Sequence, residues 1–358
     1  MIKWLLHHTW ILLFLLALFG LADVCIGEIN IFHDKDITDV VLQLRLPKTL
    51  TAVAAGGTIA ICGLLLQILF RNPLAGPYVL GISSSASLFV SIGILSGITS
   101  NIIFLNHLSL TGFAIVGAWL GILIIFLILK ITQQIGMVLL IGFMLAQFYS
   151  AFQSILDYWS DAHALKMLVV WNMASIQNTS LYQSVTLLIL SIIAFGLALF
   201  FTKPLTAYLM GDEDARLLGI DIHKTRNILI FIVSILTGIT TAYCGPIALI
   251  GMCIPILVRI SSHQANITLW IKNTFLFGAL SLLLTDVINS MFFAGSVPVN
   301  ILISLWGIPL IVWVLVKQTK FLFRILFQHQ IKVLLKFQYL LLIYVFLLNL
   351  NTLSFSVH

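Results

Sequence analysis

Apolar runs long enough to cross a lipid bilayer recur along the whole of this 358-residue chain. An α-helix rises 1.5 Å per residue, so about 20 apolar residues cover the roughly 30 Å hydrocarbon core of a bilayer. Only 8% of the residues are charged and 61% are hydrophobic, whereas a soluble domain carries about 25% charged residues. A soluble fold could not cover its surface with so few charges. The sequence therefore predicts an all-α polytopic membrane protein.

We expect ten membrane-spanning helices. They are predicted at residues 9–22, 50–69, 78–98, 108–129, 137–156, 181–201, 227–244, 245–258, 273–293 and 299–316. The eighth run is short and contains Gly245-Pro246, Gly251 and Pro255. Because backbone groups freed by a helix break cannot face lipid, we expect this segment to be broken and buried inside the bundle.

The Lys and Arg residues fall mainly on one side of this topology. Fourteen of the eighteen lie on the side of the N-terminus, and four lie on the other. Since cytoplasmic connections carry the excess of Lys and Arg, we expect both ends of the ten-helix core in the cytoplasm and the chain in a bacterial inner (plasma) membrane. The connection at 23–48 would then lie outside and the one at 202–226 inside. The N-terminal apolar run is interpreted as a retained first helix and not as a signal peptide.

The C-terminal residues 318–358 are predicted to be an extension of the membrane domain at 1–317. Residues 321–337 mix Arg324, Lys332 and Lys336 with apolar residues, which is typical of a basic helix lying on an anionic membrane surface. A mostly apolar run follows at 339–350 and is short for a span. The sequence leaves open whether the extension forms a pair of interfacial helices or an eleventh span.

Signatures of a membrane enzyme are absent from the sequence. It has no G-x-S-x-G serine and no G-x-x-x-x-G-K-[ST] loop for ATP. The cysteines lack metal-ligand or redox spacing and are interpreted as small apolar side chains. These are Cys25, Cys62, Cys244 and Cys253. We therefore expect no catalytic site, metal or cofactor in this chain, and any ATP hydrolysis must take place on a partner.

Ordered motifs surround the second predicted helix. Arg45-Leu46-Pro47-Lys48 precedes it, and Gln67 lies near its end. Gly56, Gly57 and Gly63 thin the helix and permit close packing. The Asn-Pro and Gly-Pro pairs that follow are turn signals that separate this helix from the next. They belong to Arg71-Asn72-Pro73-Leu74-Ala75-Gly76-Pro77, which is followed by Leu80-Gly81-Ile82-Ser83.

A short capped helix is predicted in the long cytoplasmic connection, within residues 211–220. Its acidic residues, Asp212, Glu213 and Asp214, suit the positive end of a helix. Gly219 suits the position just after the last helical turn, where a left-handed backbone is common.

Together these motifs resemble the FecCD-type permeases of binding-protein-dependent importers. That family carries R-x-P-R before its second helix, then N-P-L-A-x-P and L-G-[IV]-S, and G-x-x-x-A-x-x-L-G-[IV] in a cytoplasmic connection. The block at 238–259 is similar to the family's G-x-I-x-F-[VI]-G-L-x-x-P-H-x-x-R. The resemblance covers about residues 10–317 and implies the helix bundle of a type II ABC importer permease.

The resemblance also implies partners. They are a second permease copy (the same chain or a sister chain), ATP-binding cassette ATPase subunits, and a periplasmic or lipid-anchored substrate-binding protein. Arg45 and Lys48 match the family's docking positions for the binding protein, although both could simply anchor a helix end among lipid headgroups. The helix within 211–220 would be the coupling helix that docks on the ATPase, although an ordinary capped loop helix is the alternative. Its matching residues are Gly211, Asp212, Glu213, Asp214, Ala215, Leu218 and Gly219.

Three positions depart from the family pattern. Ile256 replaces a His, Asn289 replaces an Arg, and Asn300 replaces a Gly. Asp286 lies in an apolar helix, where an unpartnered carboxylate is costly. We expect it to hydrogen-bond Asn289 or Asn300 or to cap a broken helix, and a role in ion or proton coupling is the alternative. The polar residues that could line a pathway or serve packing are Gln67, Asn72, Asp286 and Asn289.

The predicted function is therefore that of the transmembrane permease subunit of an ATP-driven importer. Its cargo would be an iron-siderophore, or a haem or cobalamin-type compound, but specificity in such importers rests mostly with the binding protein. A degenerate or repurposed permease is one alternative. An ion-driven secondary transporter is another, and it would show several intramembrane charges and an inverted repeat.

Overall fold

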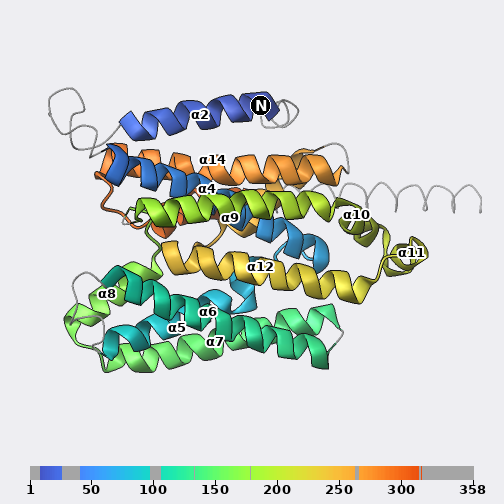
Figure 1. The fold of residues 1–358 in the computed structure, drawn as a ribbon, viewed down its shortest axis with the longest axis horizontal. Helices are drawn as coiled ribbons and strands as arrows, with labels where there is room; N and C mark the ends of the chain where they lie inside the picture. The colour runs from blue at the N-terminus through green and yellow to red at the C-terminus, as the bar shows by residue number, and fades with distance from the viewer. Residues whose placement is uncertain are drawn as a thin grey trace, which may run out of the picture. The chain divides into compact units, whose positions relative to one another are not determined.

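The computed structural model describes residues 9–25, 41–96, 106–132, 134–177, 179–262, 266–313 and 316. Contacts divide the chain into one unit of residues 1–307 and another of residues 308–358. In the first unit, long helices run side by side (Figure 1). The predicted extension at 318–358 and its boundary lie outside the described residues, so both stay predictions.

Each of the ten predicted spans coincides with an apolar helix. Six helices of the described residues are long enough to cross a membrane by themselves, and four apolar helices are shorter. The long ones are α4 (Leu46–Leu69), α6 (Asn106–Ile131), α7 (Ile135–Tyr158), α9 (Leu181–Phe200), α12 (Ile222–Cys244) and α14 (Ile267–Phe293). The shorter ones are α2 (Thr9–Cys25), α5 (Ile82–Leu95), α13 (Ile250–Ser261) and the helix Val299–Trp313.

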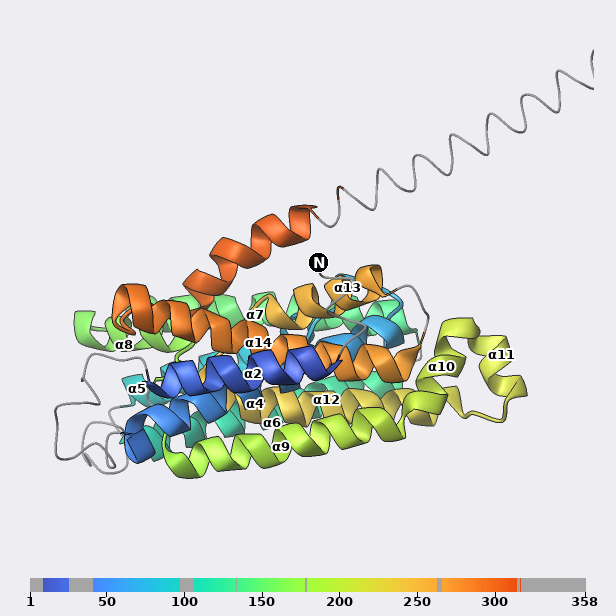
Figure 2. The same ribbon diagram turned by 90° about the horizontal axis from the view of Figure 1, so that it is seen from above.

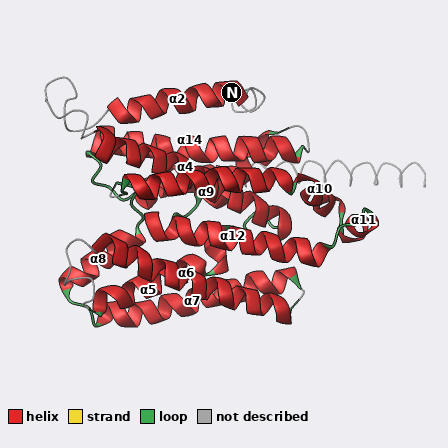
Figure 3. Cartoon of the chain, in the orientation of Figure 1, coloured by secondary structure: helices red, strands yellow, loops and turns green. Residues whose placement is uncertain are grey.

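Short helices occupy the two ends of the bundle. α10 (Thr202–Met210) and α11 (Asp212–Leu217) lie at one end, and α8 (Ala162–Asn172) lies at the other (Figure 2). Two further short turns flank the ends of α4 and α5, namely η1 (Val41–Arg45) and η2 (Pro77–Leu80). The described part of the chain contains helices and connecting loops and no strand (Figure 3).

Side-chain caps fix where several helices begin. Asp161, Asp221 and Asn266 each accept a hydrogen bond from a backbone N–H in the first turn of α8, α12 and α14. Ser180 and Gln183 form a reciprocal capping box at the start of α9. Such caps satisfy backbone donors that no helical carbonyl can reach.

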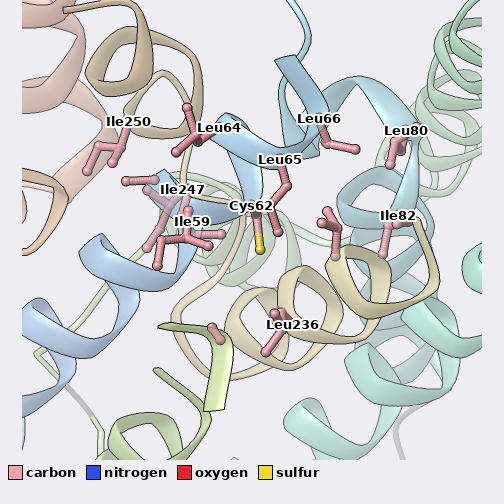
Figure 4. Packing of buried hydrophobic residues seen from close by; sticks show 14 of the residues in the cluster. Ile59, Cys62, Leu64, Leu65, Leu66, Leu80, Ile82, Leu236, Ile247 and Ile250 are labelled. Atoms are coloured by element: carbon pink, nitrogen blue, oxygen red, sulfur yellow. The ribbon is translucent and has the colours of Figure 1, made fainter. Parts of the chain in front are cut away.

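α4 is the central helix because its small residues let other helices approach closely. The most apolar membrane-length stretch of this helix is 94% buried inside the protein. The helix packs against α14, α9, α13 and α12. A Cβ added at Gly56 would overlap the carbonyl oxygen of Gly278, and one added at Gly63 would overlap that of Gly251. The predicted thinning of this helix by glycine is therefore confirmed. Larger side chains of α4 meet those of neighbouring segments in the core (Figure 4).

The eighth predicted span is broken, as expected. α12 ends at Cys244, and α13 begins only at Ile250. The freed backbone groups find partners inside the bundle: Ser175 donates to the Cys244 carbonyl at 2.9 Å. The Asn300 side chain accepts from Ala248 N–H at 3.1 Å and donates to the Pro246 carbonyl at 2.7 Å. Asn300, a departure from the family pattern, thus supplies hydrogen-bond partners for backbone groups of the broken segment.

Candidate functional site

A short helix, α11, exists where the coupling helix is predicted, and its C-terminal end is capped as expected. Glu213 and Asp214 are exposed in the first turns of α11, and Ala215 is buried beneath them. At the other end, Gly219 N–H donates to the Arg216 carbonyl at 2.9 Å, and Ile220 N–H donates to the Ala215 carbonyl at 3.1 Å. These two hydrogen bonds, together with the left-handed backbone of Gly219 (φ +77°), form a Schellman motif.

Apolar side chains project from this end of the chain. Leu217 is 86% exposed and Leu218 is 63% exposed, and Met210 at the end of α10 is also exposed. Only Leu218 was singled out from the sequence. The sequence did not indicate Leu217 or Met210, because a motif match cannot tell which side of a short helix is covered.

The junction that follows α11 is held by Asp221, the cap of α12. Its carboxylate accepts from Lys224 N–H at 3.1 Å and lies 3.5 Å from the Lys224 ammonium. The hydrogen bond from that backbone N–H lowers the pKa of the Asp221 carboxyl. The cap is therefore charged near neutral pH and is lost only as the pH falls through this lowered pKa.

Lys48 lies between two buried carboxylates at the α8 end of the bundle. Its ammonium is 3.1 Å from Asp286 of α14 and 3.7 Å from Asp23 of α2, and it donates to Ser290 at 2.6 Å. Thr49 donates to Asp23 at 2.6 Å. Asp23 was expected in the outer connection, but it lies within α2 and is 1% exposed. Its carboxylate is tolerated there because the Lys48 ammonium and the Thr49 hydroxyl contact it.

Arg45 is also turned inward. It is 8% exposed and donates to the backbone carbonyls of Val24 and Cys25 at the end of α2, at 3.1 and 3.2 Å. Arg45 and Lys48 therefore join α4 to α2 and α14. Docking of a binding protein through these two residues stays a prediction.

The predicted partners of Asp286 bind other groups. Asn289 donates to the Val297 carbonyl at 2.8 Å and accepts from Val297 N–H at 3.3 Å. Asn300 bonds the backbone of Ala248 and Pro246. Asp286 pairs with Lys48 instead. Asn289, an Arg in the family, is fully buried in this turn.

Gln67 and Asn72 serve packing and turn geometry. Gln67 is fully buried, donates to the Met252 carbonyl at 3.0 Å, and accepts from Arg259, so it ties α4 to α13. Asn72 accepts from Leu74 N–H at 2.9 Å, which closes the turn after α4. Ile256, where the family has His, is buried in α13.

α7 presents a long exposed face that the sequence analysis did not identify. Only 22% of the most apolar membrane-length stretch of this helix is buried inside the protein. The exposed side chains recur at helical spacing on one side. They include Leu140, Met144, Gln147, Ala151, Ser154 and Tyr158. The Ser154 hydroxyl donates to the Ser150 carbonyl at 2.9 Å within the helix. Because the exposed amide of Gln147 is unfavourable in hydrocarbon, this face suits a water-filled pathway or a second protein better than lipid.

A cavity of about 410 Å³ lies at the α8 end, between α6, α8, α9 and the end of α12. Lys166 and His163 of α8 line it together with Trp171, Gln183 and Tyr243. Among the residues that the structure describes, the lining combines cationic, aromatic and amide groups and includes no carboxylate, so it suits a partly apolar group that carries negative charge.

Comparison with known proteins shows a similarity that extends over most of the chain. Residues 8–317 match the model of the FecCD transport family. A vitamin B12 import system permease protein of Vibrio cholerae is 31% identical over 78% of this chain and 83% of its own length. That of Escherichia coli is 30% identical over 88% and 95%. A solved structure described as an inward-facing conformation of a metal-chelate type ABC transporter superposes with a TM-score of 0.78, at 26% identity, over 86% of this chain and 98% of that one.

Proposed function

The chain belongs to the FecCD transport family of ABC importer permeases, and from this premise we propose that it imports a metal-chelate compound with energy from a separate ATPase docked on α11. The observation that carries the proposal is the pair of exposed leucines on a rigidly capped helix beyond the end of the spanning helices. Lipid explains exposed apolar residues on the long helices. It does not explain Leu217 and Leu218, because exposed apolar surface outside the membrane indicates a protein partner.

The translocation pathway in this proposal runs along the exposed face of α7. One copy of the chain leaves Gln147 and Ser154 uncovered. A second copy, or a sister permease, facing this surface would enclose a pathway with small polar and apolar walls. Such an arrangement keeps the Gln147 amide away from lipid.

The cargo in this proposal is a chelate of the cobalamin or iron-siderophore class. The support comes from relatives named for vitamin B12 import and from a structural neighbour named as a metal-chelate type transporter. Cobalamin is the first compound to test, and an iron-siderophore is the second. A binding protein would deliver either one to the α8 end.

The test is co-purification of an ATPase. The tagged chain is solubilised mildly from native membranes, and the proteins that elute with it are identified by mass spectrometry. We expect a P-loop ATPase with the wild type. In the double variant Leu217→Asp/Leu218→Asp we expect its recovery to fall by about tenfold or more, since a loss of 1.4 kcal/mol in binding is tenfold in affinity.

Trp159→Asp/Tyr182→Asp is the matched control, because these side chains are 75% and 78% exposed at the opposite end of the bundle. It introduces the same two charges and should leave the ATPase bound. A binding protein in the same eluate is then assayed for cobalamin and for ferric siderophore. Absence of any ATPase from wild-type eluates that retain other importers would contradict the proposal and favour a degenerate permease or an ion-driven transporter.

A further inference from the structure

We propose that Arg71 is the positioning residue that ties the α10–α11 pair to the buried helix α4, so that a displacement of α11 is passed into the core of the bundle. This inference rests on the proposed function, because it concerns how an ATPase docked on α11 would move the spanning helices.

The first observation is the backbone of Arg71. The residue follows the C-terminal end of α4 and has φ +48°. A left-handed backbone is unfavourable for any residue with a Cβ. Such an outlier persists only where the surrounding contacts hold it, and it often marks a functional position.

The second observation is what this conformation achieves. The Arg71 guanidinium donates from Nη2 to the backbone carbonyl of Tyr208 at 3.0 Å. Tyr208 lies in the last turn of α10, where carbonyl groups lack helical partners and attract cations. The arginine therefore fastens the end of α10 to the end of α4.

The third observation is that Tyr208 also holds the start of α12. Tyr208 is 1% exposed, and its hydroxyl donates to the Ile222 carbonyl at 2.6 Å. Ile222 is the first residue of α12. One residue of α10 is thus joined to α4 through its backbone and to α12 through its side chain.

The mechanical consequence follows from burial. α10 and α11 are separated by the single residue Gly211, with φ +137°, so a push on α11 reaches α10 directly. α10 packs against α4, α9 and α14. Because α4 is almost wholly enclosed, it cannot shift without moving the helices that surround it. The Arg71–Tyr208 hydrogen bond is the polar tie at the point where this movement would enter α4.

Hydrogen–deuterium exchange on the purified complex tests the proposal. The chain with its co-purified ATPase is compared with and without ATP plus vanadate. In the wild type we expect nucleotide to change the exchange of residues 202–218 and also of residues 66–81. In Arg71→Ala the change at 202–218 should remain, whereas the change at 66–81 should be lost.

Two further variants separate this tie from general damage. Lys203→Ala removes another cationic side chain of the α10–α11 pair. This lysine has no hydrogen bond or ion pair to any residue that the structure describes. It should respond like the wild type. Tyr208→Phe removes the hydroxyl that donates to α12 and should keep the response at 66–81. Should Arg71→Ala fail to fold, Arg71→Lys replaces it, and we expect a reduced response at 66–81.

The outcomes are distinguishable. An unchanged response at 66–81 in an arginine variant that still binds the ATPase would overturn the inference and leave the proposed function intact. Loss of the response in Lys203→Ala as well would also overturn it. If no ATPase accompanies the wild-type chain, the proposed function fails and the inference falls with it.

Discussion

At the scale of single residues, the most consequential arrangement is the ion cluster of Lys48, Asp23 and Asp286. Three charged side chains from three helices are brought together where each would be costly alone. The side chain of Lys48 is only 14% exposed and both carboxylates are fully buried. The cluster therefore holds α2, α4 and α14 in one relative position.

Lys48→Met should destabilise the protein strongly. The change leaves two buried carboxylates without their shared cation, and breaking a buried ion pair in this way costs about 3–5 kcal/mol. The free energy of unfolding is measured by titration with SDS from mixed micelles. Arg216→Met, at an exposed cation on α11, is the control and should have little effect.

The triple variant Lys48→Met/Asp23→Asn/Asp286→Asn checks the cause. Because it removes the uncompensated charges, it should recover much of the lost stability. No recovery would mean that the lysine acts through packing and not through charge.

At the scale of helices, close backbone approach between α4 and its neighbours organises the core. Gly63 faces the backbone of Gly251 in α13, and Gly56 faces Gly278 in α14. Without a strong hydrophobic force between helices in lipid, such small-residue contacts supply much of the packing energy.

Gly63→Ala should destabilise the protein by about 1–3 kcal/mol, the usual cost of overpacking. The added methyl would meet a backbone carbonyl, which cannot rotate away. The same unfolding titration measures it. Gly196→Ala in α9 is the matched control, because nothing lies within 4 Å of the added Cβ. We expect it to be neutral or to stabilise the helix by up to about 1 kcal/mol. Equal effects at the two glycines would contradict the packing argument.

At the scale of the whole molecule, the positions of short helices at opposite ends give the topology a direct test. α10 and α11 follow the fourteen-to-four distribution of Lys and Arg and are expected in the cytoplasm, whereas α8 is expected outside.

A cysteine placed at Lys203 of α10 should react with a membrane-impermeant maleimide only after the cells are broken. A cysteine at Trp159, 75% exposed at the other end, should react in spheroplasts with intact membranes. Both are introduced into a variant in which the four native cysteines are replaced. Labelling of the two positions from the same side would refute the ten-span orientation.

The sequence by itself determined the features that depend on neighbouring residues. Ten apolar segments, the break at Gly245-Pro246, and the cap of α11 at Gly219 could all be predicted, because hydrophobic length, proline and a left-handed glycine act within one helical turn or one span. The family assignment followed from ordered motifs of the same local kind.

Only the tertiary structure decided which distant residues meet. Lys48 pairs with Asp286 across 238 positions, Arg71 binds Tyr208, and Asn300 satisfies the broken segment. The sequence suggested Asn289 or Asn300 for Asp286, and it did not reveal the exposed face of α7. Such pairings depend on the rotation of each helix about its axis and on which helices are neighbours. Those quantities arise from the packing of the whole bundle and are not encoded in any single segment.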